Sequence, residues 1–185
     1  MEHTLVSPAS GNEYVGHVPV GQLTGTGTFR CAKNGAVYTG EYEGNRFHGI
    51  GELTFASGEV YRGHFEGGWR EGGGVYTWPD GTVYRGQFKD DTSEGDGVLT
   101  FANGDVYRGQ WKGDKREGDG VCTLGGGIVR GILSMLAGRR AFEKWKGDKM
   151  VSSVPFDAAN PTHAAVLRIA NEAEARRVGT SHRRA

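Results

Sequence analysis

The chain has little cysteine, little proline and no long apolar run in its 185 residues, and each shortage excludes a class of protein. Cys31 and Cys122 lie too far apart for a zinc-ligand spacing, and two cysteines make no disulfide framework. Five prolines exclude collagen, although glycine occurs 33 times. Because the sequence shows neither a signal peptide nor about 18 consecutive apolar residues, we expect an intracellular protein in a reducing compartment.

Catalytic and metal-binding signatures are missing as well. The six histidines form no HExxH pattern and none stands beside a cysteine, and there is no GxSxG motif or phosphate-binding loop. The acidic cluster at 90–96 lacks the ligand spacing and the final glutamate of an EF-hand, which favours a solvated turn. The sequence therefore predicts no enzyme, no catalytic residue, no metal site and no cofactor.

The net charge is zero, but the charges are unevenly placed. Residues 35–126 carry 9 basic and 15 acidic side chains (net −6), whereas residues 127–185 carry 11 and 5 (net +6). An acidic middle suits a basic or helical segment as partner, and the basic tail of the same or a second copy is one such segment. Because the middle offers no basic face, we expect no nucleic-acid partner.

A repeat of 23 residues dominates what the sequence does contain. Tyrosine recurs at this interval together with glycine pairs such as Gly49/Gly51, and the tyrosines are Tyr38, Tyr61, Tyr84 and Tyr107. Within each copy the pattern alternates with period two, which predicts two short strands, and turn dipeptides such as Asn103–Gly104 separate the copies. An earlier copy begins at Gly11 and is one residue longer; we place the extra residue in the loop before Gly35.

A series of such hairpins predicts an all-β fold, namely an elongated single-layer twisted antiparallel β-meander followed by one C-terminal α-helix. We expect the aromatic rings to stack from repeat to repeat along one face, while the glycines let the rings lie flat against the backbone. Each repeat then contacts only its neighbours, as in a solenoid.

The chain divides into segments of different character. WKGDK at 145–149 repeats WKGDK at 111–115 and indicates a degenerate sixth copy, while Asn160 and Pro161 predict the start of a helix. This helix either packs on the open end of the array or docks a partner or a membrane. The predicted segments are an N-terminal extension at 1–10, the repeat array at 11–126, the degenerate sixth repeat with an insertion at 127–150, a linker at 151–160, an amphipathic helix at 161–178 and a basic end at 179–185.

The repeat resembles a known family, the MORN repeat (membrane occupation and recognition nexus), over about residues 11–126. The copies read VYTGEYEGNRFHGIGELTF, VYRGHFEGGWREGGGVYTW, VYRGQFKDDTSEGDGVLTF and VYRGQWKGDKREGDGVCTL. Asp90 replaces a glycine of the other copies, and Leu124 replaces an aromatic residue. The layout is similar to that of small retinophilin-like MORN proteins, in which the array and helix hold a helical segment of a motor-protein tail. The resemblance implies a cytoplasmic scaffold on cytoskeletal structures, commonly a cilium, flagellum or axoneme.

Two binding modes are open at this point. For a protein partner we expect a groove whose floor is formed by the recurring aromatics, about half of which also serve as core; they are Tyr38, Tyr61, Phe65, Tyr84, Phe88, Tyr107, Trp111, Phe55, Trp78 and Phe101. The alternative is weak peripheral membrane binding through the basic residues Arg139, Arg140, Lys144 and Lys146, which the negative charge of the array opposes. Open sheet ends also permit pairing of copies into a homo-oligomer.

Overall fold

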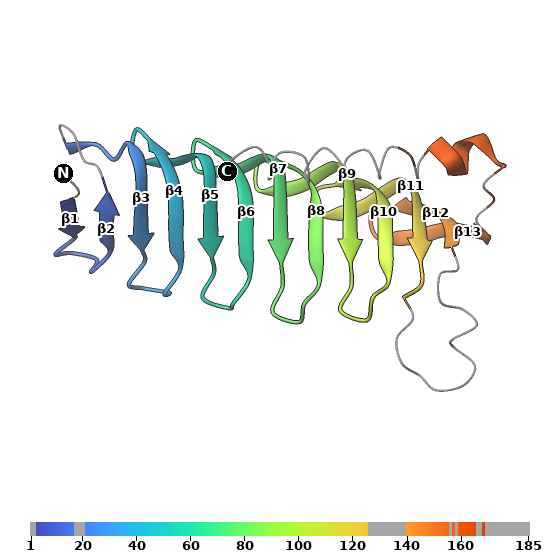
Figure 1. Ribbon diagram of the computed structural model, residues 1–185, viewed down its shortest axis with the longest axis horizontal. Coiled ribbons are helices and arrows are strands. Elements are labelled where there is room, and N and C mark those ends of the chain that lie inside the picture. The colour runs from blue at the N-terminus through green and yellow to red at the C-terminus, as the bar shows by residue number, and fades with distance from the viewer. Residues whose placement is uncertain are drawn as a thin grey trace, which may run out of the picture. The chain divides into compact units, whose positions relative to one another are not determined.

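The computed structural model describes residues 3–16, 21–125, 140–155, 157, 159–165 and 168. Within these residues, thirteen strands form one sheet whose order follows the chain from β1 to β13 (Figure 1). The predicted all-β meander is therefore confirmed. The chain divides into an N-terminal body, Met1–Pro79 with Phe88–Asp91, and a C-terminal body, Asp80–Gln87 with Thr92–Ala185.

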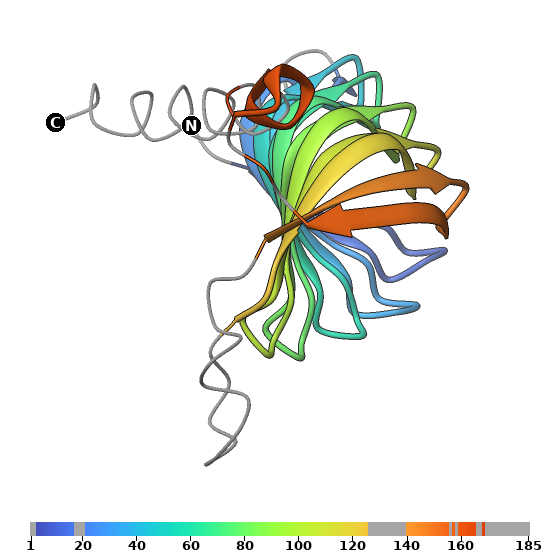
Figure 2. The ribbon, with the colours of Figure 1, turned by 90° about the vertical axis from the view of Figure 1, so that its right-hand side faces the viewer.

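In the N-terminal body each strand pairs antiparallel with the next, and successive strands are rotated against one another in the usual β-sheet twist (Figure 2). The residues expected to form an N-terminal extension include a strand, because His3–Val6 pairs with Glu13–Gly16. The strands are β1 (His3–Val6), β2 (Glu13–Gly16), β3 (Gly25–Arg30), β4 (Val37–Glu43), β5 (Arg46–Thr54), β6 (Val60–Glu66) and β7 (Trp69–Thr77).

In the C-terminal body, antiparallel pairing joins each strand from β9 to β13 with the next one in the chain. Residues 83–87 of strand β8 (Val83–Lys89) belong to this body, whereas Phe88 and Lys89 belong to the N-terminal body. The remaining strands are β9 (Thr92–Thr100), β10 (Val106–Lys112), β11 (Lys115–Thr123), β12 (Arg140–Lys146) and β13 (Lys149–Pro155).

Two kinds of turn alternate along the chain. Inside a repeat, two residues with positive φ join the strands, such as Gly44 (56°) and Asn45 (67°), as a type I′ turn requires. Between repeats, the Gly58 N–H donates to the Phe55 carbonyl over 3.0 Å, and Gly58 has a φ of 95°. The turns predicted between the repeats are therefore present, and the two-residue turns lie inside the repeats.

The loop before Gly35 holds the extra residue of the first copy. The Gly35 N–H donates to the carbonyl of Cys31, four residues earlier in the chain, over 2.8 Å. In later copies the corresponding bond spans only three residues, as from Gly104 to Phe101 at 2.9 Å. The predicted position of the insertion is therefore confirmed.

The core is a row of tyrosines that lie on glycine backbone. Tyr61 and Tyr107 are both 0% exposed. A Cβ atom built on Gly74 would lie 2.3 Å from the Tyr61 ring, and one on Gly120 would lie 2.3 Å from the Tyr107 ring. Only glycine permits this contact, as the sequence predicted. We call Tyr38, Tyr61, Tyr84 and Tyr107 the ladder tyrosines.

A second aromatic residue, four positions after each ladder tyrosine, packs edge-on between neighbouring tyrosines. The Phe65 ring lies 5.1 Å from Tyr61 and 5.0 Å from Tyr38, with interplanar angles of 89° and 88°. In the C-terminal body, Trp111 lies 5.0 Å from Tyr84 and 5.6 Å from Tyr107. Such edge-to-face contacts stabilise neighbouring repeats beyond the burial of their area.

The ladder tyrosines Tyr38, Tyr61 and Tyr107 also place their hydroxyls at a β-bulge. The register of β4 and β5 shifts after Gly40, and the Tyr38 hydroxyl donates to the carbonyl of Glu41 over 2.9 Å. Tyr61 repeats this contact with His64 at 3.0 Å. Burial raises the pKa of Tyr38 and of Tyr107 far above that of a free tyrosine, so both hydroxyls stay neutral donors.

The end of the described chain differs in part from the sequence prediction. Strand β13 continues to Pro155, so residues 151–155, which we expected to belong to a linker, lie in the strand, and residues 152–155 pair with β12. The helix begins at Pro161 as predicted, and Asn160 caps it, since its Oδ1 accepts the Thr162 N–H at 2.9 Å. Most of the insertion and most of the predicted helix at 161–178 lie outside the described residues.

Candidate interaction surface

Most of the aromatics proposed as a groove floor belong to the core. The seven that are at most 8% exposed are Tyr38, Tyr61, Phe65, Tyr84, Phe88, Tyr107 and Trp111. Glycine backbone covers one side of each ladder ring, and a residue from the following strand covers the other side of Tyr38, Tyr61 and Tyr107. In the structure as described, these seven rings therefore have no free face for a partner.

The covering residue changes from repeat to repeat. Phe47 stacks on Tyr38 at 3.8 Å and an interplanar angle of 11°. In the next repeat the Arg70 guanidinium lies 5.6 Å from the Tyr61 ring centre, and its Nε is 3.2 Å from Asp91 Oδ1. A cation over a ring face gains from the ring quadrupole, and more so when partly desolvated. A stacked ring on Tyr38 and a carboxylate-paired guanidinium over Tyr61 thus both cover the outer side of a ladder tyrosine.

The other three candidates, Phe55, Trp78 and Phe101, are half-buried. Each follows the second strand of its repeat and precedes the turn to the next repeat. In the N-terminal body Tyr76 joins them, with its ring 4.6 Å from Trp78 and 5.9 Å from Phe55. We call Phe55, Tyr76 and Trp78 the rim cluster.

The rim cluster lies on the same face as the ladder. Tyr76 pairs with Tyr61 across β6 and β7, and directly paired residues share a face of the sheet. The site prediction missed Tyr76, although its spacing of two from Trp78 placed both on one side of the strand. On the opposite face, Arg62 pairs with Glu52, and Ile50 is 63% exposed.

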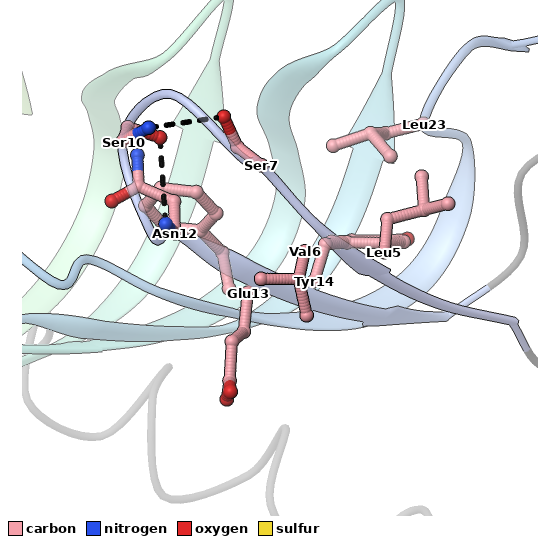
Figure 3. Close-up of a pocket in the computed structure, with 9 residues that line it drawn as sticks. Leu5, Val6, Ser7, Ser10, Asn12, Glu13, Tyr14 and Leu23 are labelled. Atoms are coloured by element: carbon pink, nitrogen blue, oxygen red, sulfur yellow. Dashed lines mark hydrogen bonds between the residues drawn. The ribbon is translucent and has the colours of Figure 1, made fainter.

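A recess of about 500 Å³ opens beside the first two strands (Figure 3). Tyr14 lines the recess, and its buried hydroxyl, which lies against Gly16 and Gly27, makes no hydrogen bond to any described residue. Leu5 and Val6, which line the recess, are 46% and 55% exposed. The full lining is Leu5, Val6, Ser7, Ser10, Asn12, Glu13, Tyr14, Leu23 and Phe29, which suits an apolar side chain better than a charged group.

The basic residues proposed for lipid binding do not form one described patch. Lys144 and Lys146 are exposed on β12, and Lys144 Nζ lies 3.8 Å from Asp119 Oδ1, which offsets part of its charge. Arg140 begins the same strand, and Arg139 lies outside the described residues. Among the described residues, we find no helix with the length and hydropathy that a bilayer crossing needs.

Reactive side chains are sparse in the part of the chain that the structure describes. There, no three His, Cys, Asp or Glu side chains come together in a way that would hold a metal ion. Cys122 is half-buried in β11, and burial raises the pKa of its thiol to about 11. A thiol with that pKa is almost entirely protonated at neutral pH and is a poor nucleophile.

The MORN repeat family model matches residues 38–60, 61–83, 84–106 and 107–129, and each match begins at a ladder tyrosine. The chain belongs to the MORN-repeat family. The copy that begins at Gly11 precedes the matched residues, yet its Tyr14 packs edge-on against Tyr42 of the first matched MORN repeat at 5.0 Å. Among curated proteins, none matches the sequence.

Several solved structures are distantly similar to the MORN sheet. The G-box domain of the microcephaly protein CPAP, described with a suggested role in centriole elongation, is 15% identical with a TM-score of 0.44, covering 80% of this chain and 78% of that one. The SAS-4 TCP domain of Drosophila melanogaster, in complex with a proline-rich motif of Ana2, is 10% identical with a TM-score of 0.40, covering 83% and 88%. The TCP10 domain of Danio rerio CPAP, in complex with a STIL peptide, is 16% identical with a TM-score of 0.34, covering 80% and 71%.

Proposed function

We propose that this MORN protein is a non-enzymatic scaffold that binds a segment of another protein at its rim cluster. The observation that carries the proposal is the half-burial of Phe55, Tyr76 and Trp78 beside a ladder that is already closed. Rings that serve only as core are buried like the ladder tyrosines. Grouped aromatic rings that stay accessible are frequent anchors for a protein partner.

The surroundings of the rim cluster indicate the chemistry of the partner. The turns that follow Phe55 and Trp78 carry Glu59 and Asp80, and the whole range 35–126 has a net charge of −6. An apolar side chain flanked by lysine or arginine would fill the cluster and meet the acidic turns. We therefore infer a basic helical or extended segment as the partner.

A crosslinking experiment tests the site. A photoreactive amino acid at position 78 should capture the partner in cells, whereas one at position 50, on the opposite face, should not. With the captured partner purified, Trp78→Ala should weaken binding by about tenfold or more, as loss of an aromatic anchor does. Ile50→Ala is the matched control and should bind as the unchanged protein does.

A charge variant separates binding from folding. Asp80 Oδ1 accepts the Thr82 N–H at 2.8 Å, and asparagine retains that acceptor while removing the charge. Asp80→Asn should therefore leave the melting temperature unchanged, weaken the affinity for the partner a few-fold and reduce the salt dependence of binding. If Trp78→Ala and Asp80→Asn both bind with unchanged affinity, the rim cluster is not the site.

On the family resemblance we further propose that the scaffold attaches to a cytoskeletal structure such as a cilium or flagellum. The test is detergent extraction of cells that express the tagged protein with and without residues 127–185. Retention of the full chain in the insoluble fraction supports cytoskeletal attachment. Complete release by detergent, together with a truncated form that is already soluble before detergent, would instead support a membrane anchor in the basic tail.

A further inference from the structure

The turn after β9 is joined to the end of β11 through one carboxylate. Asp105 Oδ1 accepts the Gly125 N–H at 2.7 Å, and Gly125 follows shortly after β11. The two backbones also touch, because a Cβ atom built on Gly125 would lie 2.3 Å from the carbonyl carbon of Gly104. The contact between this turn and the end of β11 therefore depends on the position of the Asp105 carboxylate.

Asn103 keeps that carboxylate in position. Its Nδ2 donates to Asp105 Oδ2 at 2.9 Å, and its Oδ1 accepts the Asp105 N–H at 2.9 Å. These partners fix the orientation of the Asn103 amide, because a backbone N–H only donates and a carboxylate only accepts. Both carboxylate oxygens of Asp105 thus have a donor, one from Asn103 and one from Gly125.

The Asn103 amide is also placed for a spontaneous reaction with the next residue. Asn103 and Gly104 are both exposed, and glycine has no side chain to hinder attack by its backbone nitrogen. This nitrogen loses its proton and bonds to the Asn103 Cγ, while the side-chain nitrogen leaves as ammonia and a succinimide ring closes. Water then adds to one ring carbonyl, and the C–N bond at that carbonyl breaks. Opening at Cγ gives aspartate, and opening at the main-chain carbonyl gives isoaspartate.

Either product replaces the amide donor at position 103 with a carboxylate. A carboxylate only accepts, so the contact with Asp105 Oδ2 becomes a repulsion between two negative charges. Isoaspartate also lengthens the backbone next to Gly104, where the turn touches Gly125. Asp105 is therefore displaced, and the Gly125 N–H loses its acceptor.

The other Asn–Gly turn, Asn34–Gly35, provides a matched comparison. Asn34 Oδ1 accepts the Ala36 N–H at 3.1 Å, which is the same contact that Asn103 makes with the Asp105 N–H. Aspartate at position 34 retains this acceptor, and alanine has no carboxylate to repel it. A new charge at this turn therefore leaves its hydrogen bond in place.

We propose that Asn103 is a site of spontaneous deamidation, and that the reaction releases the end of β11 from the turn at 103–105. This inference is independent of the rim cluster. Because deamidation accumulates with time, old and newly made copies of the protein differ at this junction.

Incubation of the full chain in mildly alkaline buffer, followed by peptide mass spectrometry, tests the reaction. The peptide that contains Asn103 should gain the mass of an NH2-to-OH replacement, in part as isoaspartate, which an isoaspartyl methyltransferase labels. Asn45 is the internal control, because it is also exposed but precedes Arg46, whose side chain hinders the attack. An Asn103 that is modified no faster than Asn45 would overturn the proposed site.

Asn103→Asp reproduces the aspartate product and tests its consequence. This variant should lower the melting temperature by about 4 °C or more, and the Gly125 amide should exchange its hydrogen about tenfold faster. Asn34→Asp is the matched control and should shift the melting temperature by less than about 2 °C. Equal shifts in the two variants would overturn the proposed release of β11.

A second substitution separates the repulsion from a general loss of folding. Asp105→Asn in the Asn103→Asp chain places an amide donor opposite the new carboxylate, while its Oδ1 still accepts the Gly125 N–H. The double variant should recover most of the lost melting temperature and the slow exchange at Gly125. If Asn103→Asp alone does not fold, recovery of folding in the double variant supports the same conclusion. A double variant that recovers neither property would overturn the proposal.

Discussion

The positions beneath the ladder tyrosines require glycine because a side chain there would collide with a tyrosine ring, and not because of their backbone torsion angles. Gly74 has no positive φ, yet a Cβ atom there would lie 2.3 Å from the Tyr61 ring. The preceding residue, Gly73, is exposed and also lacks a positive φ. The two neighbours thus form a matched pair in which only one position is closed to a side chain.

Gly74→Ala should lower the free energy of unfolding by about 3 kcal/mol, because the added methyl group must displace a fully buried ring. Gly73→Ala should change it by less than about 0.5 kcal/mol. Urea unfolding of both variants beside the unchanged chain measures the difference. Equal effects at the two positions would contradict the ring-contact explanation.

Cys122 should react slowly with iodoacetamide in the folded protein. Burial raises the pKa of its thiol to about 11, so little thiolate exists near pH 8. A Cys31→Ser chain leaves Cys122 as the single thiol, and its alkylation rate should climb steeply toward pH 11. In urea the same chain should react at the rate of an ordinary cysteine. Fast alkylation of the folded chain at pH 8 would show that the thiol is not shielded.

Neighbouring hairpins are joined by a bond from a turn to the preceding repeat. Asp91 Oδ1 accepts the Arg70 N–H at 2.7 Å, and Asp114 Oδ1 accepts the Ser93 N–H at 2.7 Å. Gly68 occupies the corresponding position in its own turn but has no side chain to accept the Phe47 N–H. This turn therefore lacks a contact that its neighbours have.

Gly68→Asn should stabilise the N-terminal body by about 0.5–1 kcal/mol. Asparagine tolerates positive φ, as Asn45 does at 67°, and would supply the missing acceptor. Gly68→Ala is the control, because it adds a Cβ at positive φ without an acceptor and should be destabilising. Thermal unfolding distinguishes the two variants. An asparagine variant that is no more stable than the alanine variant would show that the turn bond does not stabilise this hairpin.

The period of the sequence predicted the hairpins and the glycine-backed rings, because both follow from local alternation. It did not predict the turn bonds, since Asp91 reads as a turn former and its partner Arg70 lies 21 residues earlier. Nor did it separate core from rim. Tyr61 and Tyr76 are the same residue type on the same face, and the Arg70 guanidinium lies over both rings. Tyr61 is distinguished by the packing of Phe65 and of the Gly74 backbone against its ring.

Across the whole molecule, the neutral tyrosines couple stability to alkaline pH. Burial raises the pKa of Tyr38, Tyr42 and Tyr107 in the folded chain, whereas in the unfolded chain it is about 10. Below pH 10 the hydroxyls are neutral in both states, so their contribution to stability is fully present. Above it the unfolded chain loses protons first, and stability falls as pH rises toward the folded pKa.

Alkaline titration should therefore show tyrosinate absorbance rising together with the loss of the β-sheet circular dichroism signal, above about pH 10. Unfolding in urea at pH 7 and at pH 10.5, roughly half a unit above the unfolded pKa, should give a lower free energy at the higher pH. Ionisation of the ladder tyrosines near pH 10 in a protein that keeps its β-sheet signal would show that burial does not raise their pKa.

The ring stack also bears on how such a gene can change length. Each ladder tyrosine contacts rings of its own repeat and of the next one, and each matched repeat is 23 residues long, as in 61–83. An in-frame tandem duplication of 23 codons would place an aromatic ring at each ladder and edge-on position of the new junction. Recombination can thus lengthen or shorten this protein in whole repeats without a new packing solution.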